Sequence, residues 1–236
     1  MTIIPNQFFG LGDIIFTQTL VRRIADGRPI IWPVLPHFVE GLNRAYPDIT
    51  FVDWQSMRIE YGRTDQFAFE HEELGDCTVL PLRWADTILK VPYNDCMKAK
   101  YLLYGMDFDD WRVDAKWLRD GLKELTLFKS FILHSGVEYD LINCFFGSET
   151  NKLSVDMQMS CQTISMATLS GYSLFDWQHV IQHAAAIHTV NTSIIYLLEM
   201  LELKAPEIHL YQRPIKGQTF DNIRYLLKRH KYVFHE

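Results

Sequence analysis

The sequence predicts an α/β protein made of two compact Rossmann-like units, and three observations support this. In the first half, apolar strand-like runs alternate with segments of helical periodicity, as in the β-α-β units of a parallel sheet. The second half shows the same alternation from about residue 126 onward. The 236 residues are 48% hydrophobic and 14% aromatic, which allows a sizeable core. We therefore expect an N-terminal unit over 1–125 and a C-terminal unit over 126–236.

The first unit is expected to begin with a β-α-β-α-β series. Strands are expected at 2–8, 28–35 and 49–54, and helices at 13–25 and 37–47. The apolar residues of the first helix fall near one face, Gly27 suits its end, and Pro47 ends the second helix. Such a series predicts a parallel sheet with right-handed crossovers.

The rest of the first unit is expected to be a polar stretch, a strand and a helical region. Residues 55–76 are polar and include the acidic run EHEELGD, which is typical of a solvated surface. Residues 77–85 are strand-like, and 95–125 read as helical. The helical region contributes aromatic candidates for the core, which are Tyr101, Tyr104, Trp111 and Trp117.

The second unit is expected to start with a strand at 129–136 that ends in a glycine turn. The segments CFFGS, KLSVDMQ and CQTISMATL can each contain a strand. The clearest pattern follows: a helix, a strand at 187–190, a second helix and a strand at 207–211. A C-terminal helix is expected at 219–230.

Composition argues against several classes of function. The net charge is −6, which disfavours nucleic-acid binding, although five Lys or Arg residues fall within 216–231. The four cysteines have no C-x-x-C spacing, which indicates reduced thiols and a cytoplasmic location. The N-terminus lacks the pattern of a signal peptide, and no segment approaches the roughly 20 apolar residues of a membrane span.

Each unit offers one sharp strand-to-helix turn, and two α/β units suggest a cleft bounded by such turns. The first turn runs from Gly10 through Gly12 to Asp13. It fails the dinucleotide fingerprint because Ile15 stands where the third glycine is needed. An aspartate in the first helical turn occupies the positive end of the helix dipole and competes with a phosphate there. It suits a base that takes a proton from a hydroxyl group; the alternative is a plain capping aspartate.

The second turn is formed by Asn191, Thr192 and Ser193, which open an amphipathic helix. Free N–H groups, the helix dipole and nearby hydroxyl donors make such a turn suitable for a diphosphate. The alternative is an ordinary capping motif.

The two turns carry a resemblance to a known family. The segment GLGDIIFTQTLVRRI (10–24) resembles the N-terminal motif of the ADP-heptose:lipopolysaccharide heptosyltransferases and their relatives, which have a GT-B glycosyltransferase fold. The segment LSGYSLFDWQHVIQHAAAIHTVNTSIIYLLEML (169–201) is similar to the family's C-terminal pattern of a glycine, a helix, a buried strand and D-[TS]-G-x-x-H-L. Together they cover roughly 50 of the 236 residues, in the family's order and spacing.

The resemblance implies an inverting, metal-independent glycosyltransferase that needs no cofactor beyond its nucleotide-sugar donor. It implies that Asp13 is the general base for the acceptor hydroxyl, beside an acceptor-side loop with Gly10 and Gly12. The positions that it assigns to the donor are Asn191, Thr192 and Ser193 for the diphosphate, Gly171, Tyr172 and Ser173 for the nucleoside, Ser135 and Gly136 in a glycine-containing turn, and Lys152 as a phosphate-contacting lysine.

Three residues depart from the family pattern. Asn191 stands in place of an aspartate, Ser193 in place of a glycine and Tyr196 in place of a histidine. The chain is also shorter than usual members. These departures keep two alternatives open: a catalytically inactive nucleotide- or glycan-binding module, and a nucleotide-sugar-modifying enzyme such as an epimerase. The donor sugar, the nucleotide base and the acceptor stay open.

Three further motifs compete with this interpretation. Asp107 and Asp109 form a D-x-D, which in GT-A glycosyltransferases holds a divalent cation, but the surrounding sequence favours a helix cap. His179 and His183 have the i, i+4 spacing of zinc ligands without an accompanying glutamate. His134 precedes Ser135, yet no nucleophile elbow surrounds that pair.

Overall fold

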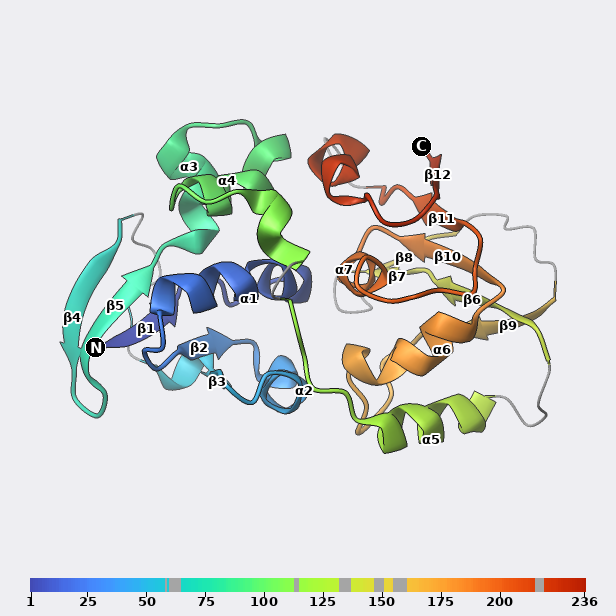
Figure 1. Ribbon diagram of the computed structural model, residues 1–236, viewed down its shortest axis with the longest axis horizontal. Coiled ribbons are helices and arrows are strands. Elements are labelled where there is room, and N and C mark those ends of the chain that lie inside the picture. Colours follow the sequence, from blue (N-terminus) through green and yellow to red (C-terminus); the bar gives the residue numbers. More distant parts are fainter. Residues whose placement is uncertain are drawn as a thin grey trace. The chain divides into compact units, whose positions relative to one another are not determined.

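The computed structural model describes residues 1–57, 59, 65–112, 115–131, 137–146, 151–154, 161–214 and 219–236. The protein is a mixed α/β protein with parallel sheets, and it divides into two compact units, Met1–Leu118 and Arg119–Glu236 (Figure 1). Helix α5 (Gly121–Phe131) contains the position of the boundary expected after residue 125. Each unit has its own sheet and is described by itself.

The first unit contains five strands that lie side by side, and all the pairs except β4 with β5 are parallel. They are β1 (Thr2–Pro5), β2 (Ile31–Val34), β3 (Thr50–Asp53), β4 (Phe67–His71) and β5 (Gly75–Leu80). β1 pairs in parallel with β5, β2 pairs in parallel with β3, and one bridge between Ile3 and Ile30 joins β1 to the segment that leads into β2. The resulting order is β3-β2-β1-β5-β4.

The β-α-β-α-β series that opens the first unit is confirmed. Helix α1 (Leu11–Ala25) lies between β1 and β2, and α2 (Pro36–Ala45) lies between β2 and β3. Ile14, Ile15 and Phe16 are completely buried, which shows that α1 packs well beyond one narrow apolar stripe.

The acidic run within 55–76 is largely exposed, as expected, but a strand in the same stretch was not predicted. β4 lies within this stretch and forms an antiparallel hairpin with β5 at the edge of the sheet (Figure 1). Phe67 and Phe69 pack against a cluster that includes Ile4 and Val79, while the alternate residues Ala68 and Glu70 are exposed. This period-two alternation is the strand signal that the acidic run obscured.

Short helices replace the single helical region expected at 95–125. They are α4 (Cys96–Leu102) and the 3-10 helix η4 (Phe108–Arg112), and a further short helix, α3 (Ala85–Leu89), precedes the region. Gly105, with a φ of +65°, follows the end of α4. Tyr101 and Trp111 are buried against Phe16, with ring centroids 5.0 and 5.5 Å from it, so these two aromatics belong to the core as expected.

The second unit is built on a five-stranded parallel sheet with the order β12-β11-β10-β6-β9. Its strands are β6 (Tyr139–Asn143), β9 (Gln162–Ser165), β10 (Ala186–Val190), β11 (Ile208–Tyr211) and β12 (Tyr232–His235). A small hairpin of β7 (Phe145–Phe146) and β8 (Asn151–Lys152) follows β6. Within this sheet the chain order reads 2-1-3-4-5, the order of flavodoxin-like α/β sheets.

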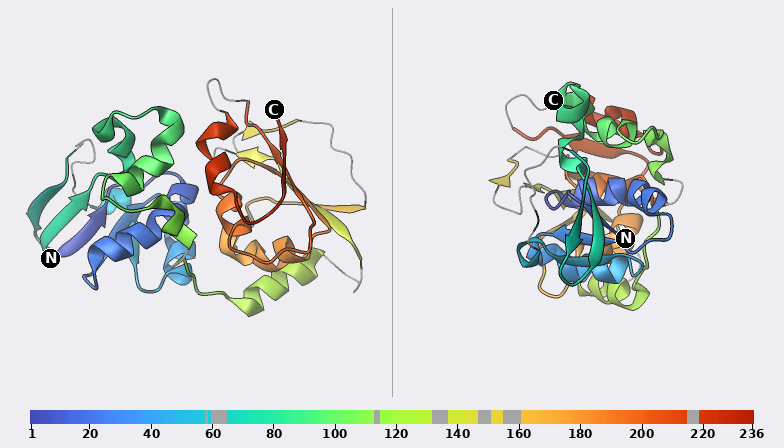
Figure 2. Two further views of the ribbon diagram at one scale, coloured as in Figure 1. Left: turned by 45° about the horizontal axis from the view of Figure 1, so that its top comes forward. Right: turned by 90° about the vertical axis from the view of Figure 1, so that its left-hand side faces the viewer.

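Several expectations for the second unit are confirmed. β10 and β11 match the strands expected at 187–190 and 207–211, and CFFGS and CQTISMATL contain β7 and β9. KLSVDMQ shares only Lys152 with β8, and its residues 155–158 lie outside the described residues. Helix α6 (Gln178–His183) and helix α7 (Ile194–Leu198) flank β10. α5 and α6 lie next to each other in both views (Figures 1 and 2).

Two expectations for the second unit are wrong. Residues 129–131 belong to α5 rather than to a strand, because Phe128 and Phe131 use helical spacing to reach His179 and Trp177. The rest of that expected strand, 132–136, lies outside the described residues. The helix expected at 219–230 is instead two 3-10 turns, η6 (Phe220–Asn222) and η7 (Arg224–Leu226), followed by β12 at the sheet edge.

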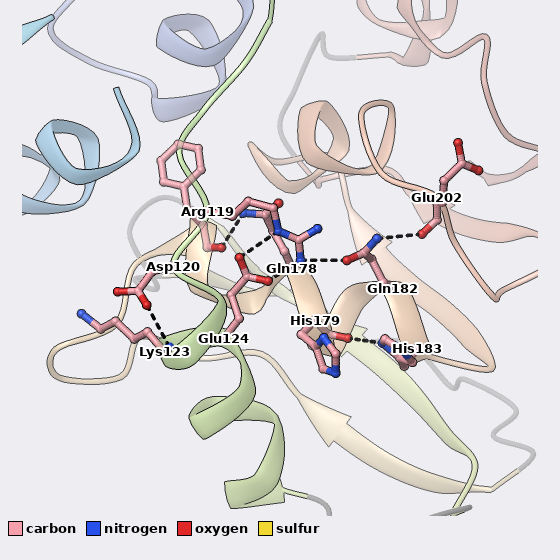
Figure 3. Close-up of polar contacts among 10 residues, drawn as sticks. Arg119, Asp120, Lys123, Glu124, Gln178, His179, Gln182, His183 and Glu202 are labelled. Atoms are coloured by element: carbon pink, nitrogen blue, oxygen red, sulfur yellow. Dashed lines mark hydrogen bonds and ion pairs between the residues drawn. The ribbon is translucent and has the colours of Figure 1, made fainter. Parts of the chain in front are cut away.

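The start of the second unit is fixed by a polar network (Figure 3). The guanidinium of Arg119 binds both carboxylate oxygens of Glu124, whose side chain is only 3% exposed, and also donates to Gln182 of α6 at 2.9 Å. Gln182 in turn donates to the carbonyl of Glu202. α5 is therefore tied to α6 and to the loop beyond α7. No helix in the described parts of the chain is long and apolar enough to span a membrane.

Candidate functional site

In the first unit, β1 is a central strand at which the strand order of the sheet reverses. β2 and β3 lie on one side of β1, and β5 returns on the other side. In open α/β sheets, ligands bind beyond the carboxyl ends of the strands at such a switch point. Asn6 joins the two strand ends here: its N–H donates to Leu80 at 2.8 Å, and its carbonyl accepts from Arg83 N–H at 3.0 Å.

Asp13 lies directly after this switch point, in the first turn of α1, with a side chain that is 33% exposed. Its Oδ1 is 2.5 Å from Nζ of Lys100, a lysine on α4 whose side chain is 5% exposed. The same ammonium donates to Oε1 of Gln7 at 2.6 Å. The buried positive charge of Lys100 is thus matched by one carboxylate and one amide oxygen, as a buried charge requires.

Sequence reasoning found Asp13 but missed Lys100 and Gln7. Lys100 is 87 positions from Asp13, and no local spacing links the two residues. The only available signal was a lysine among the apolar and aromatic residues of a helix, which in a folded protein is seldom buried without a partner.

Gly10 explains how the carboxylate of Asp13 is accommodated. Gly10 is the N-cap of α1 with a φ of +77°, and a Cβ at this position would lie 2.5 Å from Oδ2 of Asp13. Both the backbone conformation and the close approach require glycine. Gly12, by contrast, lies inside the first turn of α1 without a positive φ.

The arrangement leaves Asp13 chemically available on one side. Its Oδ1 is held by the ammonium, while Oδ2 lies beside the Gly10 backbone, and a carboxylate has acceptor positions on both oxygens. Cys96, whose pKa is affected by both Lys100 and Asp13, is no competing nucleophile, because burial raises the pKa of its thiol to about 11.

The second unit has an equivalent switch point between β6 and β10. Asn143 ends β6 and donates from its side-chain amide to the hydroxyls of Thr189, at 2.9 Å, and Thr192, at 3.0 Å. Asn191, Thr192 and Ser193 follow β10 and are half-buried. The sequence missed Asn143 because it lies at the end of a strand that the pattern of apolar residues did not reveal.

The turn at 191–193 differs from the expected helix cap. α7 has only five residues, and Ser193 at its N-cap makes no side-chain capping hydrogen bond. The backbone is instead fixed by Asn191 N–H to the carbonyl of Tyr211, at 3.3 Å, and by the carbonyl of Thr192, which accepts from Ile195 at 3.2 Å. The side chains of the turn are therefore not consumed by capping.

The remaining donor-side candidates have other partners. Gly171 has a φ of +79°, and the Ser173 hydroxyl donates to Asp176 at 3.0 Å in the capping box of the 3-10 helix η5 (Leu174–Trp177). The ring of Tyr172 lies 5.6 Å from Nζ of Lys123. Lys152 is exposed on β8 with its Nζ 5.6 Å from the ring centroid of Phe145. Ser135 and Gly136 lie outside the described residues.

The competing motifs have structural partners of their own. Asp107 accepts from Asp109 N–H at 2.9 Å at the start of η4, which is a capping contact. His183 Nδ1 lies 2.9 Å from the carbonyl of His179, and Figure 3 shows the two histidines beside each other on α6. No group of three or more His, Cys, Asp or Glu side chains within the described ranges is arranged to hold a metal ion. His134 lies outside those ranges.

A row of histidines follows the C-terminal sheet from β10 to its edge. His188 stacks on His209 with ring centroids 4.5 Å apart, and His209 Nδ1 lies 3.0 Å from Nε2 of His235. The hydroxyl of Tyr211 lies 3.1 Å from Nδ1 of His188. Burial, followed by the neighbouring imidazoles, lowers the pKa of His188 below its ordinary 6.5, and burial does the same for the pKa of His235.

Comparison with known proteins gives only distant similarities. No protein-family model matches the chain, and no curated protein matches it. Among solved structures, the chain is similar to the iron-containing dodecameric glycosyltransferase TibC from enterotoxigenic E. coli H10407, with 11% identity and a TM-score of 0.48 over 89% of this chain. It is also similar to the glycosyl transferase family 9 protein from Veillonella parvula DSM 2008, with 8% identity and a TM-score of 0.46, covering 100% of this chain and 85% of that one. The chain spans 57% of the length of TibC.

Proposed function

We propose that the protein is a glycosyltransferase that moves a sugar from a nucleotide-sugar donor to an acceptor hydroxyl. The observation that carries the proposal is Asp13, a partly exposed carboxylate that follows the switch point of the first sheet and has one oxygen fixed by a buried ammonium. The resemblance of 10–24 and 169–201 to the heptosyltransferases supports the same assignment. In this proposal the two Rossmann-like units combine in the GT-B manner that the resemblance implies.

On the acceptor side, Asp13 is the proposed general base. A general base must reach the proton that it removes, and its position must be fixed. Lys100 fixes Oδ1 at 2.5 Å, which leaves Oδ2 to accept a proton from the acceptor hydroxyl next to Gly10. The oxygen that loses this proton then attacks the anomeric carbon of the donor from the face opposite the leaving diphosphate, which inverts that centre.

On the donor side, the turn at 191–193 is the proposed diphosphate site. Asn143 donates to the Thr192 hydroxyl, which leaves the hydroxyl hydrogen of Thr192 to donate to a phosphate oxygen. Together with backbone N–H groups, such donors can stabilise the leaving diphosphate without a metal ion. Donor-binding roles for Gly171, Tyr172, Ser173, Ser135, Gly136 and Lys152, and a cytoplasmic location, belong to the same proposal.

The test is a turnover screen with ADP-, UDP- and GDP-sugars and a panel of glycoside acceptors, each with and without EDTA. We expect transfer that EDTA leaves intact, and a loss of about 100-fold or more in kcat for Asp13→Asn, within the range for a removed general base. Asp107→Asn, which alters an aspartate that only caps η4, is the matched control and should keep full activity. Full activity of Asp13→Asn contradicts the base assignment, and loss of activity both in EDTA and in Asp107→Asn contradicts the metal-independent mechanism.

A second candidate is a catalytically inactive nucleotide- or glycan-binding module. Two observations favour it: the ammonium of Lys100 already neutralises Asp13, and Asn191 replaces an acidic residue of the family pattern. This candidate predicts that a nucleoside diphosphate raises the melting temperature of the protein while no donor is turned over. Thr192→Val should then remove the thermal shift, because the hydroxyl donor is lost while the shape of the side chain is kept.

A further inference from the structure

Aromatic side chains gather around one arginine at the carboxyl ends of three strands of the first unit. The group consists of Phe8, Phe9, Trp54, Arg83 and Trp84, and we refer to it as the Phe9 platform. Phe8 is buried and stacks on Trp54 at 5.1 Å with an interplanar angle of 10°, and Phe9 lies 4.2 Å from Phe8. The guanidinium carbon of Arg83 lies 5.1 Å from the ring centroids of both phenylalanines and 5.2 Å from that of Trp84.

The platform exposes apolar and cationic groups together. The Phe9 residue is 39% exposed, and Arg83 is exposed as well. Among the residues that the structure describes, Arg83 forms no ion pair, and its guanidinium lies over the faces of three rings. A single exposed phenylalanine needs no explanation, but a stacked group of rings around a guanidinium without an ion pair has the composition of a ligand site, which combines aromatic surface with a few placed polar groups.

The position of the platform matches the switch point of the sheet. Phe8 and Phe9 follow β1, and Arg83 and Trp84 follow β5, the two strands between which the strand order reverses. The backbone link between Asn6 and Arg83 holds these two strand ends together. Ligands of open α/β sheets bind at this position.

The platform is also mechanically connected to Asp13. The side-chain amide of Gln7 donates to the carbonyl of Phe9 at 2.6 Å, and its Oε1 accepts from Lys100 at 2.6 Å. Lys100 then binds Asp13. The carbonyl of Gln7 accepts from the indole of the buried Trp32 at 3.0 Å, which fixes the middle of this chain of contacts. The backbone of Phe9 and the carboxylate of Asp13 are thus linked through Gln7 and Lys100.

We infer that the Phe9 platform is a saccharide-binding subsite that takes a pyranose ring of the acceptor. The ring's axial C–H groups would pack on the face of Phe9, whose π electrons attract their partial positive charge. Arg83 would donate hydrogen bonds to the sugar oxygens, because a guanidinium has five donors and no acceptor. This inference rests on the proposed function: the neighbouring carboxylate takes the proton of a hydroxyl group, and sugars supply such groups.

Binding is measured without any donor, by saturation-transfer NMR on a panel of methyl glycosides and disaccharides. The variants Phe9→Leu and Phe9→Trp separate loss of an aromatic face from loss of apolar surface, and Arg83→Gln removes the charged donors. Leu122→Ala, which truncates an exposed apolar side chain in the second unit, is the matched control. Circular dichroism of each variant confirms that it is folded before binding is compared.

We expect at least one glycoside to bind the wild type, about five- to ten-fold weaker binding in Phe9→Leu, and near-normal binding in Phe9→Trp and Leu122→Ala. The inference is overturned if no glycoside binds, if Phe9→Leu binds as well as the wild type, or if adenosine or uridine displaces the glycoside.

The two proposals fail in different ways. Glycoside binding at the platform without transfer from any nucleotide-sugar contradicts the transferase but supports the subsite. Transfer in which Phe9→Leu leaves the KM of the acceptor unchanged contradicts the subsite but supports the transferase.

Discussion

At the scale of single residues, the central feature of the first unit is the contact between Asp13 and Lys100. A carboxylate at the start of a helix is common, but here it compensates a lysine whose side chain is almost fully buried. The contact therefore has a structural consequence whether or not Asp13 acts as a base. Removing either partner leaves the other charge without compensation, which costs more than the pair itself contributes.

We predict that Lys100→Met lowers the free energy of unfolding by about 2 kcal/mol. The expected loss is below the roughly 3–5 kcal/mol of a fully buried pair because Asp13 is one third exposed and water screens its charge. Urea unfolding measures the change. Asp13→Asn in the same background should cost less than it does in the wild type, since the two changes affect one contact. Equal midpoints for Lys100→Met and the wild type would contradict a compensated buried pair.

Gly10 gives a second prediction at this scale. Gly10→Ala should lower stability by about 1–2 kcal/mol for the positive φ and should also displace the carboxylate of Asp13, so kcat falls with it. Gly27→Ala is the matched control, because Gly27 has a φ of +78° near the other end of the same helix with nothing within 4 Å of a Cβ. Urea denaturation and turnover of both variants separate the effect of backbone strain from that of the contact between the new Cβ and Asp13. Identical effects of the two substitutions would exclude a role for the contact with Asp13.

At the scale of elements, local sequence patterns predicted the helices and strands whose core contacts are near in sequence. The series β1-α1-β2-α2-β3 and the strands β10 and β11 were predictable, because their apolar runs and periodicity are clean. β12 was not, because residues 228–230 owe their conformation to α7: Glu199 accepts from the N–H groups of Lys228 and Arg229, and His230 contacts the carbonyl of Leu198. Tertiary contacts of this kind override helical periodicity.

The histidine row across β10, β11 and β12 makes the stability of this sheet depend on pH. In the folded protein the pKa values of His188 and His235 are lowered, so below the ordinary value of 6.5 the unfolded chain binds more protons than the folded one. The free energy of unfolding should therefore fall as pH decreases through 6.5 and below. Above pH 6.5 both histidines are neutral in the folded and the unfolded chain, and this loss of stability is absent. Asp140 opposes the shift at His188, and Glu207, which pairs with Lys231, lies 3.5 Å from Nε2 of His209 in the middle of the row.

The measurement is urea unfolding from neutral to mildly acidic pH, followed by tryptophan fluorescence, to which residues 119–236 contribute through Trp177. His188→Gln keeps a polar partner for Tyr211 but cannot titrate, and it should flatten the pH dependence. An unchanged slope in His188→Gln would show that other groups cause the acid sensitivity.

At the scale of the whole molecule, the sequence located the two strand-to-helix turns proposed as sites, but it did not predict the strand orders that place them at switch points. The residues of β1 pair with those of β5, such as Thr2 with Cys77, and no local pattern reveals a partner that distant. Only the strand order shows that Phe9, Asp13 and the turn at 191–193 each lie by a switch point of its own sheet. For the same reason Lys100, Asn143 and the Phe9 platform were not predictable.

This organisation predicts that two ligands act on two separate segments. A nucleoside diphosphate should slow amide hydrogen exchange around 189–195, and a methyl glycoside should slow it around 6–13, because each binds beyond the strands of a different sheet. At 100 times its dissociation constant, either ligand alone should stabilise its folded unit by about 2.7 kcal/mol. Hydrogen exchange read by mass spectrometry, with each ligand added separately, measures both effects. Thr192→Val should abolish only the first protection and Phe9→Leu only the second. If both ligands protect the same segment, the two units do not divide donor and acceptor between them, and the assignment of the sites has to be abandoned.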